Sequence, residues 1–216
     1  LRLEGNKIAA FLSGLGLRHE DRICLFMDRI PELYFSFLGV LKIGAIVQPL
    51  FSAFGEESLY VRLNDAQTCA IITQKKYLPK IRKIREMLPN LEYILVVDQA
   101  EPIKPGNKEI YLNLEDLDPV ENFSIFPTKA DSPSLLHYTS GTTGQPKGVQ
   151  HVHYSLLSQY LSSKWVLDLK DDDVYWCTAD PGWVTGISYG IIGPWTLGIT
   201  QCVLDAGFSA QNWYRF

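Results

Sequence analysis

The sequence is poor in the features that mark several protein classes. It has only four cysteines, and no two of them form a Cys-x-x-Cys pair. This excludes a zinc knuckle or a disulfide scaffold and favours reduced, buried thiols. No apolar run reaches the about 20 residues of a transmembrane helix, and the chain opens on a mixed helical pattern without a signal peptide. We therefore expect a cytoplasmic protein that does not act in a membrane.

An excess of positive charge is also lacking. The formal net charge is −4, which gives no electrostatic case for binding nucleic acid. Hydrophobic residues make up 46% of the chain and charged residues 20%, ordinary values for a globular protein. A length of 216 residues suits one or two domains.

Short apolar runs alternate with amphipathic segments along the chain. The runs predict strands at residues 23–27, 45–47, 69–73, 93–97, 134–138, 149–151, 174–177 and 200–204. Helical spacing predicts helices at residues 4–15, 31–43, 56–65, 78–88 and 153–165, after Trp183 and from Ala210. Residues 98–131 are rich in proline and predict an irregular connection with one helical turn near 114–117. The alternation predicts an α/β fold with parallel-rich sheets flanked by helices in βαβ units, with ligands at the carboxyl ends of the strands.

A run rich in glycine and hydroxyl residues follows the predicted strand at 134–138. Residues 138–148 read Tyr-Thr-Ser-Gly-Thr-Thr-Gly-Gln-Pro-Lys-Gly. Glycines allow a tight backbone nest whose N–H groups hold an anion, hydroxyls add donors, and Lys147 adds a mobile cation. The spacing does not fit Walker A, because that pattern places Gly-Lys-Ser/Thr five positions after its first glycine. The run therefore indicates a different polyphosphate-binding loop, with a solvated turn as the plainer alternative.

This run resembles the signature of the adenylate-forming superfamily. A second run, residues 178–189 (Thr-Ala-Asp-Pro-Gly-Trp-Val-Thr-Gly-Ile-Ser-Tyr), closely resembles the corresponding segment of AMP-forming acetyl-CoA synthetases. The resemblance implies that residues 1–216 form part of the AMP-binding N-terminal domain. Within it we expect one α/β subdomain at about 28–170, parts of a second at 1–27 and 171–216, and no C-terminal domain. Both ends look cut, so we expect a piece from the N-terminal half of a longer enzyme.

The resemblance also implies a reaction and its site. Acetate, or another short-chain acid, would react with ATP to give an acyl-adenylate and pyrophosphate, and then with coenzyme A to give acetyl-CoA and AMP. Lys147 and Thr142 would act in catalysis, and a magnesium ion held by the phosphates would need no cage of protein ligands. The expected ATP-phosphate contacts are Thr139, Ser140, Gly141, Thr142, Thr143, Gly144 and Lys147.

The two other substrates would bind at separate segments. Trp183, Val184 and Thr185 would line the acyl pocket, although on sequence alone this segment reads as a strand-to-helix turn with a core tryptophan. Ser52, Ala53 and Phe54 would contact coenzyme A, although this loop lacks the commoner glycine-rich form. Basic residues at 75–85 indicate a solvated helix face or a site for a phosphorylated partner.

Several observations leave other interpretations open. Ile187 stands where many relatives have a histidine, which puts a gating role in doubt and weakens the choice of acetate. His137, His151 and His153 lack the acid or cysteine that would complete a zinc set, so we expect no metal bound by protein ligands. The Tyr-Gly-x-Thr-Glu and Thr-Gly-Asp motifs of the family and its C-terminal lysine do not occur, so we expect the chain alone to be inactive. The alternatives are a medium-chain or aryl acyl-CoA synthetase and a non-catalytic nucleotide-binding module; the sequence leaves the oligomeric state open.

Overall fold

A computed structural model describes residues 1–98, 108–140, 144–207 and 209–216. The helices are α1 (Arg2–Gly14), α2 (Pro31–Lys42), α3 (Glu56–Asp65), α4 (Leu78–Ile84), α5 (Ser155–Trp165), α6 (Val184–Ile187), α7 (Gly193–Leu197) and α8 (Ala210–Arg215). The strands are β1 (Arg22–Phe26), β2 (Ile46–Pro49), β3 (Ala70–Thr73), β4 (Tyr93–Val96), β5 (Glu109–Tyr111), β6 (Pro133–Thr139), β7 (Lys147–Val152), β8 (Val174–Trp176) and β9 (Thr200–Cys202). Short 3₁₀ turns are η1 (Lys75–Tyr77), η2 (Arg85–Met87) and η3 (Leu114–Asp116), and η4 (Ser188–Ile192) is a π-helical turn.

The larger part of the molecule is built on a seven-stranded sheet in the order β5-β4-β3-β1-β2-β6-β7. Six strands run parallel, and only β7 runs antiparallel to its neighbour β6. The central strands are continuous apolar runs because helices cover both of their faces; all four residues of β3, for example, are buried.

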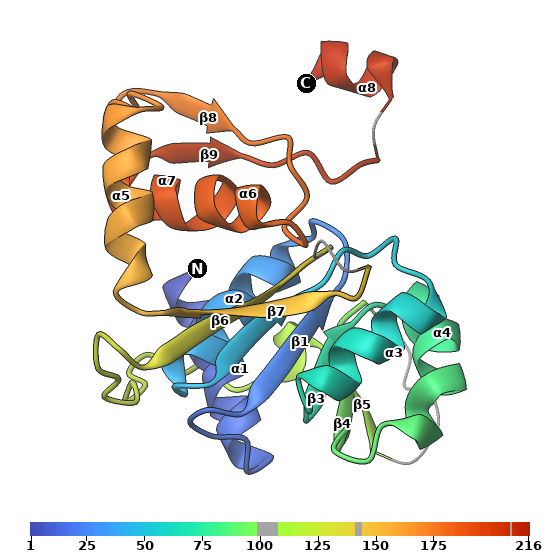
Figure 1. Ribbon diagram of the computed structural model, residues 1–216. Coiled ribbons are helices and arrows are strands. Elements are labelled where there is room, and N and C mark those ends of the chain that lie inside the picture. The colour runs from blue at the N-terminus through green and yellow to red at the C-terminus, as the bar shows by residue number, and fades with distance from the viewer. Residues whose placement is uncertain (99–107, 141–143, 208) are drawn as a thin grey trace.

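Helices form a layer on each face of this sheet (Figure 1). On one face α1 and α2 bury residues at helical spacing, among them Ile8, Leu12, Phe37 and Val40, against the strands. On the other face α3 and α4 bury a second set that includes Leu59, Leu63 and Ile81. The layered α/β architecture predicted from the alternating pattern is confirmed.

The smaller part lies beyond the β6–β7 edge region and holds the parallel pair β8–β9, α5, α6, η4 and α7 (Figure 1). Ile187, Ile191 and Ile192 belong to the same buried cluster as α1 and α2. The π-helical turn thus joins the small sheet to the core of the large one.

The structure differs from the sequence prediction in two places. Residues Glu109–Tyr111 form an edge strand, β5, inside the segment expected to be irregular. The helix expected at 78–88 ends at Ile84 and continues as a 3₁₀ turn. The central strand of the large sheet is β1, between β3 and β2.

Within the described ranges, no helix combines the length and the apolar character that crossing a bilayer requires.

Candidate functional site

The glycine-rich run connects β6 to the antiparallel strand β7. Thr139 and Lys147, at the two ends of the run, are cross-strand partners in the last pair of the ladder. Thr139, Ser140, Gly144 and Lys147 are exposed. Gly144 has φ +81°, a left-handed conformation that glycine adopts without strain. Three of the expected phosphate contacts, Gly141, Thr142 and Thr143, lie outside the described residues.

Lys147 is available for an anionic ligand. No acid forms an ion pair with it among the residues that the structure describes. A lysine ammonium across the ladder from the exposed Thr139 is a group that suits phosphate oxygens.

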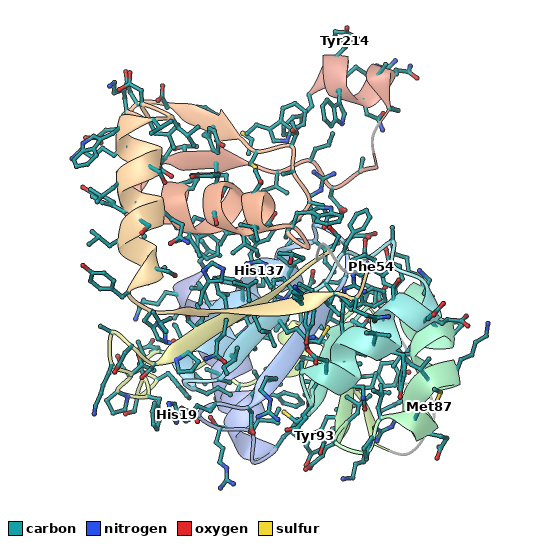
Figure 2. All side chains as sticks on the ribbon, in the orientation of Figure 1. His19, Phe54, Met87, Tyr93, His137 and Tyr214 are labelled. Atoms are coloured by element: carbon teal, nitrogen blue, oxygen red, sulfur yellow. The ribbon has the colours of Figure 1, made fainter. Side chains whose placement is uncertain are left out.

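The run lies at the carboxyl edge of the parallel strands. The loops that follow β1, β2 and β3 leave the sheet at this same edge, because these strands run parallel to β6. Substrates of open α/β sheets bind at that edge. In this molecule the carboxyl edge of the sheet also faces the smaller part of the molecule (Figure 1). Figure 2 shows Phe54, from the loop after β2, on that side of the large sheet.

Three aromatic rings meet at this edge, and we call them the aromatic wall: Phe51, Phe54 and Trp183. The ring of Trp183 lies 5.4 Å from that of Phe51 and 6.2 Å from that of Phe54, between centroids, and the two phenylalanines are 5.8 Å apart. Trp183 is 46% exposed, so the wall presents an apolar surface to solvent. The structure thus brings together a residue expected in the acyl pocket and one expected at coenzyme A. Trp183 lines this edge and is no core tryptophan.

A close backbone contact holds the segment in place. A Cβ on Gly182 would lie 2.3 Å from the Phe51 Cα, so only glycine fits between the segment and the loop after β2. The Asp180 carboxylate accepts a hydrogen bond from the Gly182 N–H (2.8 Å) and thereby caps the turn. Burial raises the pKa of Asp180, and the Gly182 N–H opposes that rise. These contacts give Asp180 a structural role.

The remaining expected residues lie close to the wall in the chain but differ in exposure. Val184 and Thr185 open α6 and are exposed, Ala53 is exposed, and Ser52 is buried. Ile187 is fully buried in the core rather than facing this surface.

A cleft of about 590 Å³ opens beside the wall, lined by Asp28, Arg29, Phe51, Ser52, Lys76, Asp180, Asp205, Ala206 and Gly207. Lys76 and the Tyr77 hydroxyl both donate to the Asp28 carboxylate. Burial raises the pKa of Asp28, but these hydrogen bonds outweigh it and leave the pKa below its usual value. Arg29 donates to the carbonyl oxygens of Thr178 (3.3 Å) and Ala206 (3.0 Å), which ties the loop after β1 to the ends of β8 and β9.

The three histidines His137, His151 and His153 lie on or next to the β6–β7 pair. β7 ends at Val152, so His153 lies beyond the strand and not on one face of it with His151. His137 and His151 instead stack edge to face, with centroids 5.4 Å apart. Across the described ranges, no three His, Cys, Asp or Glu side chains are grouped so that they could hold a metal ion.

The comparisons with known proteins identify the family. A sequence model described as "AMP-binding enzyme" matches residues 1–215. The chain belongs to this family. It is 41% identical to the acetyl-coenzyme A synthetase of Bacillus subtilis (strain 168), over 99% of this chain and 37% of that protein. It is 34% identical to the acetyl-coenzyme A synthetase of Pyrobaculum arsenaticum, over 94% of this chain and 32% of that one.

Solved structures agree with this assignment. The chain superposes on an acyl-CoA synthetase of Brucella canis with a TM-score of 0.88 at 25% identity, over 98% of this chain and 38% of that one. It superposes on an anthranilate CoA ligase in complex with anthranoyl-AMP with a TM-score of 0.85 at 29% identity, over 94% of this chain and 39% of that one. The expected kinship with adenylate-forming enzymes is confirmed, and the chain spans between 32% and 39% of the length of these relatives.

Sequence reasoning missed two arginines of the site region. Arg29 joins the two parts through main-chain oxygens, and Arg62 stacks on Phe54 with 4.2 Å between its Cζ and the ring centroid. Neither residue stands in a recognisable motif. The signal that could have found Arg62 is its place on the polar face of a helix that follows an aromatic loop directly.

Proposed function

We propose that this chain forms the ATP- and acid-binding part of an AMP-forming acyl-CoA synthetase that acts on acetate or another short-chain carboxylate. The observation that carries the proposal is the exposed Thr139–Lys147 pair at the carboxyl edge of the sheet, next to the aromatic wall. The names of the relatives support the acid.

In the first step a carboxylate oxygen attacks the α-phosphorus of ATP, and the bond to the leaving pyrophosphate breaks. Lys147 and Thr142 would act at the phosphates, with Thr139, Ser140, Gly141, Thr143 and Gly144 supplying hydroxyl and backbone donors. Such donors stabilise charge that grows on the phosphates in the transition state. A magnesium ion would add charge on the phosphate oxygens, and the hydroxyls at Thr139 and Ser140 are the oxygen donors that suit it.

In the second step the thiol of coenzyme A loses its proton and attacks the acyl carbonyl, and AMP leaves. Trp183, Val184 and Thr185 would contact the acyl group, and Ser52, Ala53 and Phe54 the coenzyme. The proximity of Trp183 to Phe54 supports this arrangement, because the acyl carbon and the thiol must meet.

An acid-dependent exchange of pyrophosphate into ATP tests the proposal. We would compare this chain with the product of the full reading frame that encodes it, using acetate, propionate, butyrate and benzoate. We expect exchange by the full product, fastest with acetate, and none by this chain alone. Lys147→Met should lower the rate roughly a hundredfold, the scale for losing one donor to transition-state charge, whereas Lys170→Met, on an exposed turn, should leave it unchanged.

The outcomes separate the alternatives. Fastest exchange with benzoate would favour an aryl-acid enzyme, in line with the similarity to the anthranilate CoA ligase. Binding of ATP without exchange in either protein would overturn the proposal in favour of a non-catalytic nucleotide-binding module.

A further inference from the structure

Arg62 lies in the last turn of α3 and reaches back toward the start of that helix. Its Nη1 donates to the Ser58 carbonyl oxygen one turn earlier (2.7 Å). Helical side chains lean toward the N-terminus, so this direction is the expected one. It brings the guanidinium over Phe54, which stands just before the helix, with 4.2 Å from Cζ to the ring centroid.

The guanidinium also faces the strand that leads into the phosphate-binding run. Its Cζ lies 5.9 Å from the ring centroid of Tyr138, the residue directly before Thr139. The Tyr138 hydroxyl donates to Asp65 Oδ2 (2.6 Å), so α3 holds this strand end through a hydrogen bond as well as through the cation. Arg62 therefore touches both the strand of the phosphate run and the aromatic wall.

The hydrogen bonding of Arg62 is incomplete. Its Nε is buried, and no described residue accepts a hydrogen bond from it. Leaving a buried donor unpaired costs stability, and a methionine or leucine of similar length would avoid that cost. Stability alone does not explain an arginine here, whereas the planar guanidinium can lie flat on the Phe54 ring, which neither an aliphatic chain nor a lysine can do.

We propose that Arg62 is a positioning residue, which fixes Phe54, and through Phe54 the indole of Trp183, relative to the phosphate-binding strand. A second part of the proposal is that this position of Trp183 determines how tightly the carboxylate substrate binds, and only this part rests on the proposed function. The first part concerns the position of Trp183 alone and can be tested without measuring catalysis.

The first experiment measures that position in this chain. The five tryptophans are replaced by 5-fluorotryptophan, and Trp183→Phe identifies the Trp183 signal in the ¹⁹F NMR spectrum. We expect Arg62→Met and Arg62→Lys to shift that signal and to leave the other four in place. Arg22→Met is the matched control, because within the described ranges the Arg22 side chain, like that of Arg62, donates hydrogen bonds to main-chain oxygens alone, those of Glu20, Ala66 and Gln67. Arg22 begins β1, at the opposite edge of the sheet from the wall.

An unmoved Trp183 signal in a folded Arg62→Met variant would overturn the proposal. If that variant does not fold, Arg62→Lys, which keeps the charge but not the planar guanidinium, gives the same test, and an unmoved Trp183 signal in it overturns the proposal. A shift in Arg22→Met as large as that in Arg62→Met would also overturn it, because the effect would then be general loosening.

The second experiment measures kinetics in the product of the full reading frame. Losing a cation–π contact at a partly desolvated site corresponds to roughly a five- to thirtyfold weakening. We expect Arg62→Met to raise KM for the carboxylate by that factor while kcat stays within about twofold, with Arg62→Lys recovering only part of the loss. A lowered kcat at unchanged KM would overturn the second part, and absence of acid-dependent exchange in the unaltered protein would refute the proposed function while the NMR result still decides the first part.

Discussion

The contact between Gly182 and the loop after β2 allows a quantitative prediction. A Cβ at position 182 would lie 2.3 Å from both the Cα and the N of Phe51, whereas ordinary contact begins at 3.4 Å. The two backbones would have to separate by about 1 Å, which would break the Asp180 cap and pull Trp183 away from Phe51. Overpacking of this kind costs about 1–3 kcal/mol, and here both contacting atoms are backbone, which cannot rotate away, so we expect the upper half of that range for Gly182→Ala.

Equilibrium unfolding in urea, followed by circular dichroism, measures this cost. We expect a lower midpoint with an unchanged slope, and a fall in Tm of about 2–4 °C for each kcal/mol lost in a chain of this size. Gly14→Ala is the control, because Gly14 ends α1 with nothing within 4 Å of its added Cβ, and alanine should leave stability equal or slightly higher. Equal midpoints for Gly182→Ala and the unaltered chain would refute the reasoning, since the backbones would then part without strain.

Three further predictions concern polar groups. Burial, reinforced by the nearby His151, lowers the pKa of His137 from its usual 6.5 to about 4, so the unfolded chain binds this proton more readily than the folded chain. The free energy of unfolding should therefore fall by about 3 kcal/mol as the pH drops from 6.5 to 4. Urea unfolding at the two pH values measures this fall, which should be smaller in His137→Asn. Arg82 forms a two-bond pair with the buried Glu109, so Arg82→Met, which leaves a buried carboxylate without its partner, should cost about 1–3 kcal/mol. Glu109→Gln should cost less, because the charge then left unpaired is that of the half-exposed Arg82, which water can solvate; equal losses would contradict this. Tyr138→Phe should cost about 1 kcal/mol for its hydrogen bond to Asp65, and calorimetry showing no loss would mean that water replaces it fully.

The sequence predicted most of the large sheet because its local signals agree. Glu56 begins α3 and Asp65 ends it as expected, since two acids open the helix and an apolar stripe follows. Strands such as β3 were found because buried parallel strands are uninterrupted apolar runs between helices.

The missed strand β5 shows where local signals fail. It has three residues, and it follows Lys108, which adopts a left-handed conformation with φ 59°. Its position depends on pairing with β4 and on the Arg82–Glu109 contact, both of which join distant parts of the chain. A pattern read within a short stretch of sequence carries no information about this strand pairing or about the Arg82–Glu109 contact.

Within the candidate site, too, one feature has a local signal in the sequence and another depends on contacts between distant segments. The glycine-rich run could be singled out from the sequence because its glycines, hydroxyls and lysine adjoin in the chain. The aromatic wall could not, because Phe51 and Trp183 are more than 100 positions apart and meet only where Gly182 lets two backbones touch.

The cross-strand pairing of Thr139 with Lys147 also bears on how the run can change in evolution. The ends of the turn are fixed by the ladder and not by the turn itself. The entropy of closing a flexible loop grows only slowly with length, by about 0.6 kcal/mol for each doubling. Residues between the pair could be added, lost or exchanged while the hydroxyl at one end and the ammonium at the other keep their spacing, so the sheet holds these two side chains at a constant separation while the loop between them varies.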